Sequence, residues 1–347
     1  MGPGQSGGEM SKRVVVVVPT LNEAANIRAC LISLRKGAPG TPIWVYDGGS
    51  RDGTPSIVKE LSEVCPDIHL LRNPRRVQAA AINLAAMRAR KQGFEVLVRA
   101  DAHALYPANF AAKLLSTMHK SGAASVVVPM ISRGEGEWQK AAADLFNSRL
   151  GHGGAGHRGL GKSGYVRHGH HAAFDLAVFE QLGGYDVSFV ANEDAEFDHR
   201  LHKAGHRIYQ EAGAAITYLP RVSPYGLWRQ MIRNGWYRAR NLAIHRTPPK
   251  PRQILPLVLF AGNLTSALLA VQGYGEAILL PLAYAALVVA WAQIIPKRFA
   301  PVHALRIAGL AMLCHHGFAI GAAAFCLAQG WSGIRQRLFP GQRPCRV

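Results

Sequence analysis

The chain has 347 residues, enough for one large or two smaller domains with a substantial core, so disorder is not expected as the general state. Its 40 Lys and Arg residues against 21 Asp and Glu residues give a net charge of +19, which favours an anionic partner: nucleic acid, an anionic membrane or a phosphorylated substrate. The five cysteines are scattered and lack both a C-x-x-C pair and zinc-site spacing, which predicts free thiols in a reducing compartment.

The position of the basic residues decides among these partners. After Glu211 the chain has fifteen Lys and Arg residues and one acidic residue, Glu276. The same part of the chain holds its long apolar runs, and apolar runs with Arg-rich flanks are typical of a protein at an anionic membrane leaflet. Nucleic-acid binding is disfavoured, because no recognised motif or aromatic-interleaved basic run accompanies the charge.

The N-terminus carries no targeting signal that the residues support. Residues 1–11 are rich in Gly and Ser and are predicted to be disordered. The valine run 14–18 ends at Pro19 and is shorter than the roughly 7–15-residue apolar core of a signal peptide. We therefore expect the N-terminal half of the chain to remain in the cytoplasm.

From Lys12 onward, strand-like and helix-like segments alternate. The strand-like segments are Val14–Val18, Ile43–Tyr46, Ile68–Leu71 and Val96–Arg99, and the helix-like segments are Glu23–Arg35, Thr54–Leu61 and Val77–Lys91. This alternation predicts a Rossmann-like α/β domain over residues 12–220, with a mainly parallel sheet and helices on both faces. Residues 150–170 are rich in Gly, His and Arg without periodicity, and are expected to form a long loop over the site.

The C-terminal part of the chain is predicted to associate with a membrane. Residues 221–253 form a basic, amphipathic, interfacial segment, residues 254–328 hold two or three transmembrane helices, and residues 329–347 form a basic tail. The apolar stretches are Ile254–Val271, Ala277–Ile295 and Ala304–Ala328. The first two fit the positive-inside pattern, but a third crossing would place the Arg-bearing tail outside, unless one stretch is re-entrant or interfacial.

Two polar clusters follow the first two strands. Pro19 and Asn22-Glu23 come directly after the valine run, and because Pro cannot extend a buried strand while Asn-Glu can begin a helix, a turn at a ligand-binding edge is expected. The run Asp47-Gly48-Gly49-Ser50-Arg51-Asp52-Gly53-Thr54 follows the second strand. An acidic residue there can accept hydrogen bonds from a ribose or uracil, and glycines let a ligand approach the backbone. A helix cap and a plain turn are the alternatives.

A third cluster, Asp101-Ala102-His103, follows the strand that ends at Arg99. A carboxylate and an imidazole two residues apart can both ligate a divalent cation that bridges a diphosphate. An isolated D-x-H is more often an accident of the surface, and the metal interpretation depends on the position of this one at a third strand end.

These motifs together resemble the family 2 glycosyltransferases with the GT-A fold. The resemblance is carried by VVVVVPTLNE, DGGSRDGT, the acidic motif at Asp101 and GGYDVSFVANEDAEFDHRLHKAG, and it covers residues 13 to about 245. Within the family, GHGGAGHRG, VRHGHHAAF and RQMIRNGWYRAR before a membrane tail most resemble the bacterial branch that assembles succinoglycan and related exopolysaccharides. That branch transfers glucose from UDP-glucose to a lipid-linked oligosaccharide.

The resemblance implies a role for individual residues. The nucleotide would be held by a set that comprises Pro19, Asn22, Glu23, Asp47, Gly48, Asp52 and Asp101. Asp101 with His103 takes the place of the family's usual D-x-D site for Mg²⁺ or Mn²⁺, which is a departure from the commoner pattern. Asp194 of Asn192-Glu193-Asp194 falls where the family has its general base. Glu193 and Glu196 are rival carboxylates for this role. A salt bridge to Arg200 is the structural alternative for Glu196 and Asp198.

Two further groups have divided interpretations. Gln230 and Arg233 give Q-x-x-R without the immediately following Trp of processive synthases, which argues against long-chain polymerisation. They could contact the donor diphosphate, or with Trp236 belong to an interfacial basic helix. The histidines 168, 170 and 171 are expected to line or underlie the acceptor pocket, and a zinc site there is disfavoured.

The leading hypothesis is therefore a metal-dependent, inverting hexosyltransferase at the cytoplasmic face of the membrane. Its expected partners are a nucleotide-sugar donor, most simply UDP-glucose, and a polyprenyl-diphosphate-linked glycan acceptor. The alternative is a catalytically inactive membrane protein that binds a nucleotide sugar or a glycan, which the D-x-H in place of D-x-D would explain.

Overall fold

The computed structural model describes residues 13–37, 40–154, 161–296 and 300–338. Within it the chain forms two compact units. The first comprises the described residues of 1–129, 160–187 and 200–216, and the second those of 130–159, 188–199 and 217–347. The predicted disordered stretch 1–11 lies outside the described residues. Each unit is described by itself.

The first unit is built on an eight-stranded sheet in the order β3-β2-β1-β4-β9-β6-β10-β8. Its strands are β1 (Val14–Thr20), β2 (Ile43–Asp47), β3 (Ile68–Arg72), β4 (Val96–Arg99), β6 (Ser125–Val128), β8 (Gly164–Val166), β9 (His170–Asp175) and β10 (Ile208–Gln210). The strands β1 to β4 are mutually parallel, β10 is parallel to β6, and β9 and β8 are antiparallel to their neighbours. The prediction of a mainly parallel sheet is confirmed.

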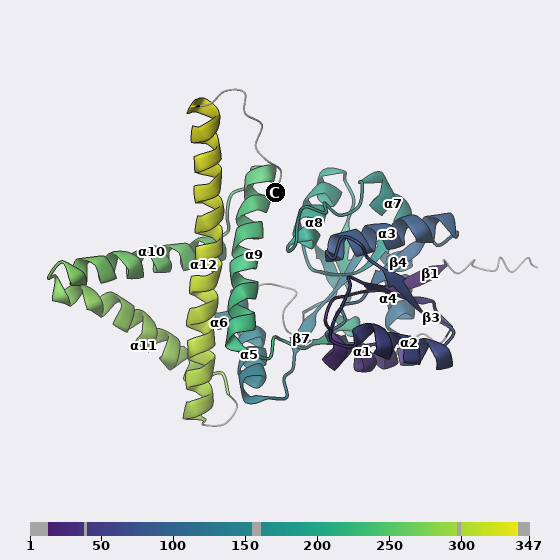
Figure 1. The fold of residues 1–347 in the computed structure, drawn as a ribbon, viewed down its shortest axis with the longest axis horizontal. Helices are drawn as coiled ribbons and strands as arrows, with labels where there is room; N and C mark the ends of the chain where they lie inside the picture. Colours follow the sequence, from purple (N-terminus) through teal and green to yellow (C-terminus); the bar gives the residue numbers. More distant parts are fainter. Residues whose placement is uncertain (1–12, 38–39, 155–160, 297–299, 339–347) are drawn as a thin grey trace, which may run out of the picture. The chain divides into compact units, whose positions relative to one another are not determined.

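Helices cover both faces of this sheet (Figure 1). They are α1 (Ala24–Gly37), α2 (Thr54–Val64), α3 (Gln78–Lys91), α4 (Phe110–Ser121) and α7 (Leu176–Gln181), and a short strand β5 (Ala104–Leu105) follows β4. Val15 to Val18 of β1 are 0–1% exposed, because the strand lies between neighbours in the sheet and between two helical layers. The buried strands thus end at one edge, where the polar motifs begin.

Residues 150–170 do not form one irregular loop as expected. Helix α6 (Arg149–His152) and strand β8 occupy part of the stretch, and β9 begins at its end. Tyr165 and Val166 complete an antiparallel pairing with Tyr209 and Ile208 of β10, so the backbone hydrogen bonds of β10 override the Gly-rich composition. Residues 155–160 of the predicted loop lie outside the described residues.

The second unit is mainly helical. It holds α5 (Glu137–Asn147), α6, α9 (Pro224–His245), α10 (Pro251–Val271), the 3₁₀ turn η2 (Gly275–Ile278), α11 (Leu279–Gln293) and α12 (Pro301–Leu338). A short strand β7 (Met130–Ser132) lies beside β11 (Ile216–Tyr218). Helix α8 (Glu193–Lys203) begins in this unit and ends in the first, which also holds the 3₁₀ turn η1 (Ala212–Ala214).

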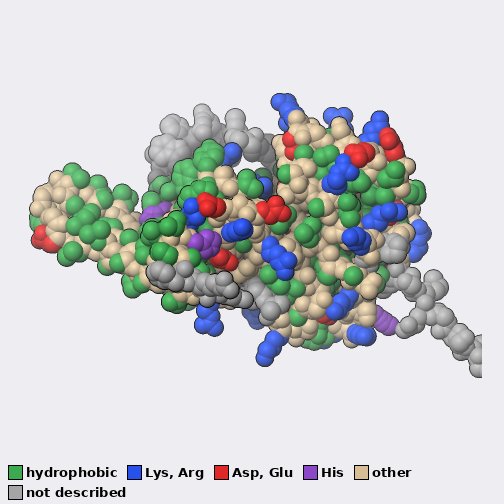
Figure 2. Space-filling view, turned by 90° about the horizontal axis from the view of Figure 1, so that it is seen from below, with side chains coloured by type: hydrophobic (Ala, Val, Ile, Leu, Met, Phe, Trp, Pro, Cys, Tyr) green, Lys and Arg blue, Asp and Glu red, His purple; other side chains and the backbone are tan. Residues whose placement is uncertain are grey.

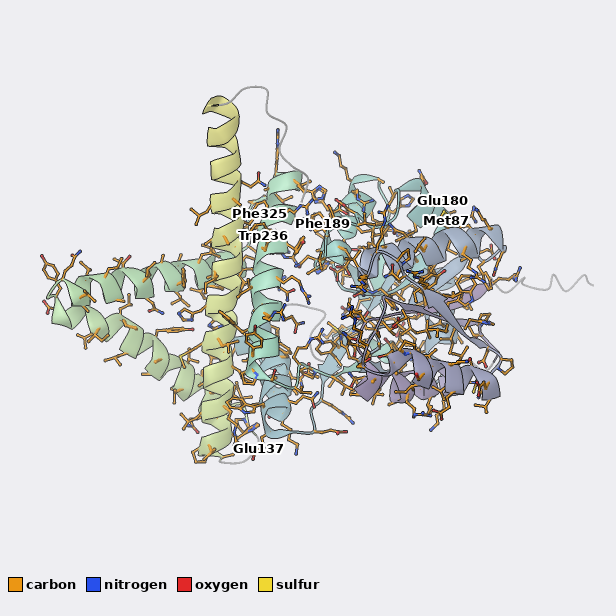
Figure 3. All side chains as sticks on the ribbon, viewed as in Figure 1. Met87, Glu137, Glu180, Phe189, Trp236 and Phe325 are labelled. Atoms are coloured by element: carbon orange, nitrogen blue, oxygen red, sulfur yellow. The ribbon has the colours of Figure 1, made fainter. Side chains whose placement is uncertain are left out.

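Three helices of the second unit are long and apolar enough to cross a membrane, and they indicate membrane association. They are α10, the segment Gly275–Gln293 with α11, and Pro301–Gly330 of α12. Helices α10 and α11 form a hairpin with many large hydrophobic side chains on its surface (Figure 2). Helix α12 runs beside α9, where Trp236 meets Phe325 edge to face with their ring centroids 5.5 Å apart (Figures 1 and 3). It continues to Leu338, into the predicted basic tail.

Candidate active site

The first part of the site is a double turn at the carboxyl ends of β1 and β2, which pair in parallel register with Pro19 opposite Tyr46. Asn22 has a left-handed backbone with φ 56°, a conformation that Asn tolerates well. Its backbone N–H donates to Ser50 Oγ at 2.8 Å, and its side-chain Oδ1 accepts from the Arg51 N–H at 2.9 Å. The two predicted motifs are therefore one structure, locked by reciprocal hydrogen bonds.

Asp47 organises the second of these turns. Its Oδ2 accepts from the backbone N–H groups of Gly49 and Ser50 at 2.8 and 3.0 Å, and its Oδ1 accepts from the hydroxyls of Ser50 and Thr20 at 2.5 and 3.3 Å. A carboxylate has about four lone-pair positions, and these four donors use them. Asp47 is 8% exposed. In this arrangement its carboxylate stabilises the backbone of the turn, whereas the sequence predicted that it binds the nucleotide.

Gly48 and Asp52 shape the same edge. Gly48 is buried and donates its N–H to the Thr20 carbonyl at 2.8 Å. Asp52 is exposed, accepts from the Ala24 N–H at the start of α1 at 2.9 Å, and accepts from the Thr54 hydroxyl at 2.6 Å. A carboxylate at a helix N-terminus stabilises the helix dipole, so Asp52 caps α1 across the two motifs.

Asp101 lies directly beyond β4 within a charged network. Its Oδ1 accepts from Arg99 Nε at 3.2 Å and from Gln78 Nε2 at 3.1 Å, and its Oδ2 lies 3.5 Å from His170 Nε2. Burial raises the pKa of Asp101, but the Arg99 charge, helped by His170 and His103, outweighs burial and holds the pKa well below its ordinary value. The carboxylate is thus kept ionised although its side chain is 10% exposed.

His103 is oriented by Glu23. Its Nδ1 lies 3.0 Å from Glu23 Oε1, and the Glu23 side chain is buried, with its other oxygen accepting from Asn26 Nδ2 at 2.9 Å. When one ring nitrogen of a neutral histidine donates to a carboxylate, the tautomer is fixed, with the proton here on Nδ1 and the lone pair on Nε2. The predicted nucleotide residue Glu23 and the predicted metal residue His103 are therefore one pair.

The donor set around Asp101 is small for a metal site. Across the described ranges, no group of three or more His, Cys, Asp and Glu side chains has the geometry to hold a metal ion by itself. A cation that bridges a diphosphate needs fewer protein ligands, because such ions are commonly held by one or two side chains plus substrate phosphates and water. An ionised carboxylate and a histidine positioned by a carboxylate fit that arrangement.

The predicted base lies at the start of α8, in the second unit. Among the four neighbouring carboxylates, Glu193, Glu196 and Asp198 are buried at 6, 4 and 2% exposure, whereas Asp194 is partly exposed. Glu196 Oε1 lies 3.2 Å from His245 Nε2, which accounts for its burial. Asp194 Oδ1 accepts from the Ala195 N–H at 2.7 Å. The most accessible of these carboxylates is therefore the predicted one.

Helix α9 holds the backbone just before Asp194. Arg238 Nη2 donates to Asn192 Oδ1 at 2.6 Å, and Asn192 Nδ2 donates to the Asn234 carbonyl at 3.3 Å. Asn192 has φ 58°, so these bonds fix a left-handed residue at the start of the motif. Burial lowers the pKa of Arg238, and the nearby Asp194 charge partly offsets this.

Gln230 and Arg233 lie in the middle of α9. Gln230 Nε2 donates to the Tyr218 hydroxyl at 3.4 Å, while its buried Oε1 accepts no hydrogen bond from the described residues. Arg233 is exposed. Both the diphosphate and the interfacial interpretation of this pair stay predictions.

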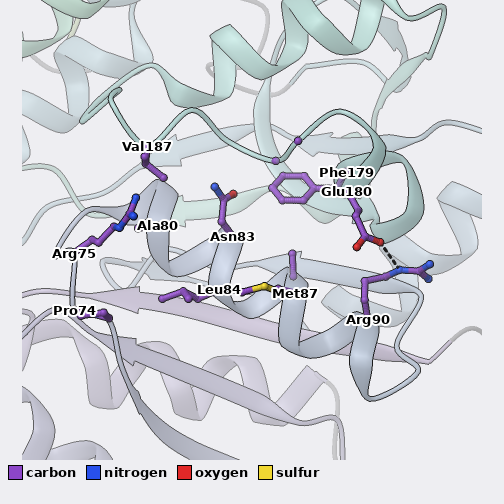
Figure 4. A pocket seen from close by; sticks show the side chains of 13 residues that line it. Pro74, Arg75, Ala80, Asn83, Leu84, Met87, Arg90, Phe179, Glu180 and Val187 are labelled. Carbon is purple, nitrogen blue, oxygen red and sulfur yellow. Dashed lines mark hydrogen bonds and ion pairs between the residues drawn. The ribbon is translucent and has the colours of Figure 1, made fainter.

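A cavity of about 420 Å³ lies elsewhere in the first unit, between α3 and α7 with its following loop (Figure 4). Its walls are mostly apolar, and Arg90 Nε and Glu180 Oε2 form an ion pair of 3.1 Å at its rim. None of the predicted site residues lines it. The strand ends, and not this cavity, carry the predicted chemistry.

Sequence reasoning missed several members of the site. Gln78 and Arg99 bind Asp101 directly, and the Tyr185 hydroxyl accepts from Arg99 Nη1 at 3.2 Å. His170, predicted to line or underlie the acceptor pocket, has its Nε2 3.5 Å from Asp101 Oδ2. An Arg at the end of an otherwise apolar strand was a usable signal, because a buried Arg needs a carboxylate partner. Nothing in the sequence singled out Gln78.

The fold is an α/β domain with its polar motifs at the strand ends, and sequence comparison identifies its class. The profile described as "Glycosyl transferase family 2" matches residues 15–183. The chain is 41% identical over 249 residues to "Succinoglycan biosynthesis protein ExoA" of Rhizobium meliloti, covering 71% of this chain and 74% of that protein. The chain belongs to the family 2 glycosyltransferases of the exopolysaccharide type, with the GT-A fold.

More distant matches agree with this family. "Polyprenol monophosphomannose synthase" of Mycolicibacterium smegmatis is 29% identical over 110 residues, which are 31% of this chain and 42% of that protein. Among solved structures, the Pyrobaculum calidifontis mannosyltransferase PcManGT, in complex with GDP-Man and Mn²⁺, matches with TM-score 0.52 and 23% identity, covering 96% of this chain and 89% of that one. This likeness supports the fold.

Proposed function

We propose that this glycosyltransferase is metal-dependent and transfers a hexose, glucose from UDP-glucose, to a polyprenyl-diphosphate-linked glycan at the cytoplasmic face of the membrane. The observation that carries the proposal is the network at the end of β4, which keeps Asp101 ionised beside a histidine positioned by Glu23. The relative from Rhizobium meliloti, named for succinoglycan biosynthesis, supports the exopolysaccharide context, and the polyprenol-linked mannose synthase supports a lipid carrier.

At the donor, the locked turns of Pro19, Asn22 and Asp47 would form the nucleoside edge, with Gly48 and Asp52 keeping the backbone in place. Asp101 and His103 would hold Mg²⁺ or Mn²⁺, which when bound neutralises charge on the nucleoside diphosphate that leaves. Glu23 would act through His103, by fixing which ring nitrogen points to the cation. Arg233 and Gln230 are further candidates for the diphosphate.

At the acceptor, Asp194 would take the proton of the attacking hydroxyl. As the hydroxyl oxygen forms its bond to the anomeric carbon, the bond from that carbon to the UDP oxygen breaks from the opposite face, and the configuration inverts. The partial exposure of Asp194 supports this role, since a general base must reach the proton that it accepts. The buried Glu196 is already engaged with His245.

The test is release of nucleoside diphosphate by the full chain in detergent, with UDP-Glc, UDP-Gal, UDP-GlcNAc and GDP-Man as donors and a lipid-linked glycan as acceptor. UDP-glucose with Mg²⁺ or Mn²⁺ should be turned over fastest, and EDTA should abolish turnover. Asp194→Asn should lower kcat by about 10²–10⁴-fold, the usual contribution of a general base, with donor binding unchanged.

The rival carboxylate Glu193 supplies the control, because Glu193→Gln should leave most of the turnover if Asp194 is the base. An unaffected Asp194→Asn variant would refute the base assignment. Metal-independent UDP binding without turnover on any donor would instead support the inactive binding protein.

A further inference from the structure

The three apolar helices differ in how far the protein itself buries them. In the apolar window of α12, 44% of the residues are buried within the protein, compared with 6% in α10 and 17% in the segment of α11. A helix that is apolar on all sides belongs either in a bilayer or in the interior of a protein. Hydropathy cannot separate these two cases, but burial can.

The middle of α12 is packed against α9 at backbone contact. A Cβ atom on Gly321 would collide with the carbonyl oxygen of Ile232, and one on Gly235 would collide with the carbonyl oxygen of Phe318. One turn earlier, a Cβ on Gly317 would lie 3.0 Å from the Trp228 side chain. The small-residue spacing Gly317-x-x-x-Gly321 therefore already has its partner, which is α9.

Helix α9 does not have the composition of a membrane-embedded helix. It carries four arginines, of which Arg229 and Arg233 are exposed, while Arg240 donates to the carbonyl and hydroxyl of Ser188 at 2.8 and 2.7 Å. Arginine side chains within hydrocarbon are costly and rare. Because α12 follows α9 at backbone contact, that part of α12 stays out of the hydrocarbon as well.

The N-terminal end of α12 is held by α5, which is also polar. His303 Nε2 lies 2.8 Å from Asp144 Oδ2, and Arg306 Nη2 lies 2.6 Å from Glu137 Oε2 (Figure 3). The buried apolar side chains along α12 are Ala304, Ile307, Ala308, Leu310, Ala311, Cys314, Ala319, Ala322 and Phe325. The apolar character of α12 is thus explained by contacts within the second unit.

The hairpin of α10 and α11 is much less buried by the rest of the second unit. Its two helices leave α12 and meet at a tip away from it, with large apolar side chains such as Val258 and Leu287 60 and 70% exposed (Figure 1). Near α12, Asn263 Nδ2 lies 3.1 Å from His316 Nε2, and the Tyr284 hydroxyl lies 3.0 Å from His315 Nδ1. From Asn263 to its end at Val271, α10 extends about 12 Å past this contact at ~1.5 Å per residue, so the end of the hairpin can enter a hydrocarbon core of about 30 Å without crossing it.

We propose that the chain enters the bilayer through the α10–α11 hairpin alone, and that α12 stays at the membrane surface on the side of α5 and α9, as the base from which the hairpin projects. The C-terminal residues after α12 then lie on the same side as the N-terminal catalytic residues. This placement removes the conflict with the positive-inside pattern, because the arginines at 335, 337, 343 and 346 need not cross. The inference rests on the membrane association in the proposed function and is independent of the chemistry.

The native thiols provide the test. Cys30, Cys65 and Cys314 are buried and Cys326 is exposed, so a Cys326→Ser variant leaves Cys345 as the thiol to follow. The full chain is expressed in a Gram-negative host and treated with a membrane-impermeant maleimide, in spheroplasts and in inverted membrane vesicles. A Cys326→Ser/Cys345→Ser chain reports background labelling.

A Met87→Cys substitution in the Cys326→Ser/Cys345→Ser chain marks the side of the membrane on which the catalytic residues lie. Met87 suits this purpose because it is 53% exposed on α3 and lines no part of the strand-end site. We expect Cys345 and Met87→Cys to label in the same preparation. Both should label in inverted vesicles, and both at least tenfold less in spheroplasts. Labelling of Cys345 in spheroplasts, with Met87→Cys labelled in inverted vesicles, would mean that α12 crosses the bilayer and would overturn the proposal. Neither readout requires a donor, an acceptor or turnover, so the outcome is separate from that of the proposed function.

Discussion

The pair of Glu23 and His103 supports a prediction that separates two roles for the same carboxylate. In Glu23→Gln the side chain keeps its size, but its charge is lost and the amide can present either a donor or an acceptor to His103 Nδ1. The 3.0 Å contact then no longer fixes the tautomer or raises the basicity of the ring. We expect the variant to fold, because the Glu23 backbone N–H still donates to Thr54 Oγ1 at 2.9 Å.

The size of the effect follows from the position of Glu23 one step away from the cation. Loss of a carboxylate that orients a metal-binding histidine typically weakens metal affinity by about 10–100-fold, or about 1.4–2.7 kcal/mol. We therefore expect the Mn²⁺ dissociation constant, measured by titration calorimetry in the presence of UDP, to rise by that factor. The matched control is Asn26→Ala, which removes the 2.9 Å bond to the other oxygen of Glu23 but leaves His103 in place, and it should change Mn²⁺ affinity by less than about twofold.

The second measurement is UDP affinity in EDTA. If Glu23 acts through His103, Glu23→Gln should leave metal-free UDP binding within about twofold of the wild-type value. The contrary result, in which UDP affinity falls in EDTA as much as Mn²⁺ affinity does, would mean that Glu23 contacts the nucleotide itself, as the sequence resemblance implied. The reasoning from the structure would then be wrong at this residue.

Three further predictions concern the turns and the helical packing. Asp47→Asn should lower the free energy of unfolding by about 1.5–3 kcal/mol in denaturant titrations, because the amide NH₂ would face the donors that the carboxylate now accepts from. A loss of UDP affinity without a loss of stability would contradict the structural role of Asp47. Gly321→Ala should destabilise the chain by about 1–3 kcal/mol, because its Cβ would collide with the α9 backbone. Gly309→Ala in the same helix, where a Cβ meets nothing within 4 Å, should stabilise the chain by up to about 1 kcal/mol. Equal shifts in the thermal unfolding of the two variants would refute the α9–α12 contact. Arg238→Lys should lower kcat about tenfold with little change in donor affinity, since the bond to Asn192 before the predicted base is lost, and an unchanged kcat would show that this bond does not position Asp194.

The first half of the fold was predictable because each of its strands is short, apolar and followed by a polar turn. β1 to β4 and the helices between them lie where the periodicity placed them, within a few residues. The strands β8 and β9 were not predicted, because their stability comes from pairing with β10 and β6 far along the chain. A Gly- and His-rich sequence carries no local signal for such pairing.

The site was predictable to the level of its motifs, but not of its contacts. The positions after β1, β2 and β4 had to converge once the strands were parallel, and they do. What each carboxylate does depends on partners that sequence spacing does not reveal: Asp47 accepts from its own turn and from Thr20, Asp52 caps α1, and Glu23 faces His103. Their shared acidity made them look alike, and burial and hydrogen bonding separate them.

The same limit explains why the membrane-associated part needed the structure. The apolar windows of α10 and α12 are both long and apolar enough for a membrane span, so composition alone does not distinguish them. The difference lies in what surrounds them, since α12 contacts a helix with four arginines through glycines and reaches α5 through His303 and Arg306. Because the polar partner of α12 is α9, far earlier in the chain, no window on α12 itself can detect it. The conflict with the positive-inside pattern left the number of crossings at two or three, with one stretch re-entrant or interfacial in the lower count.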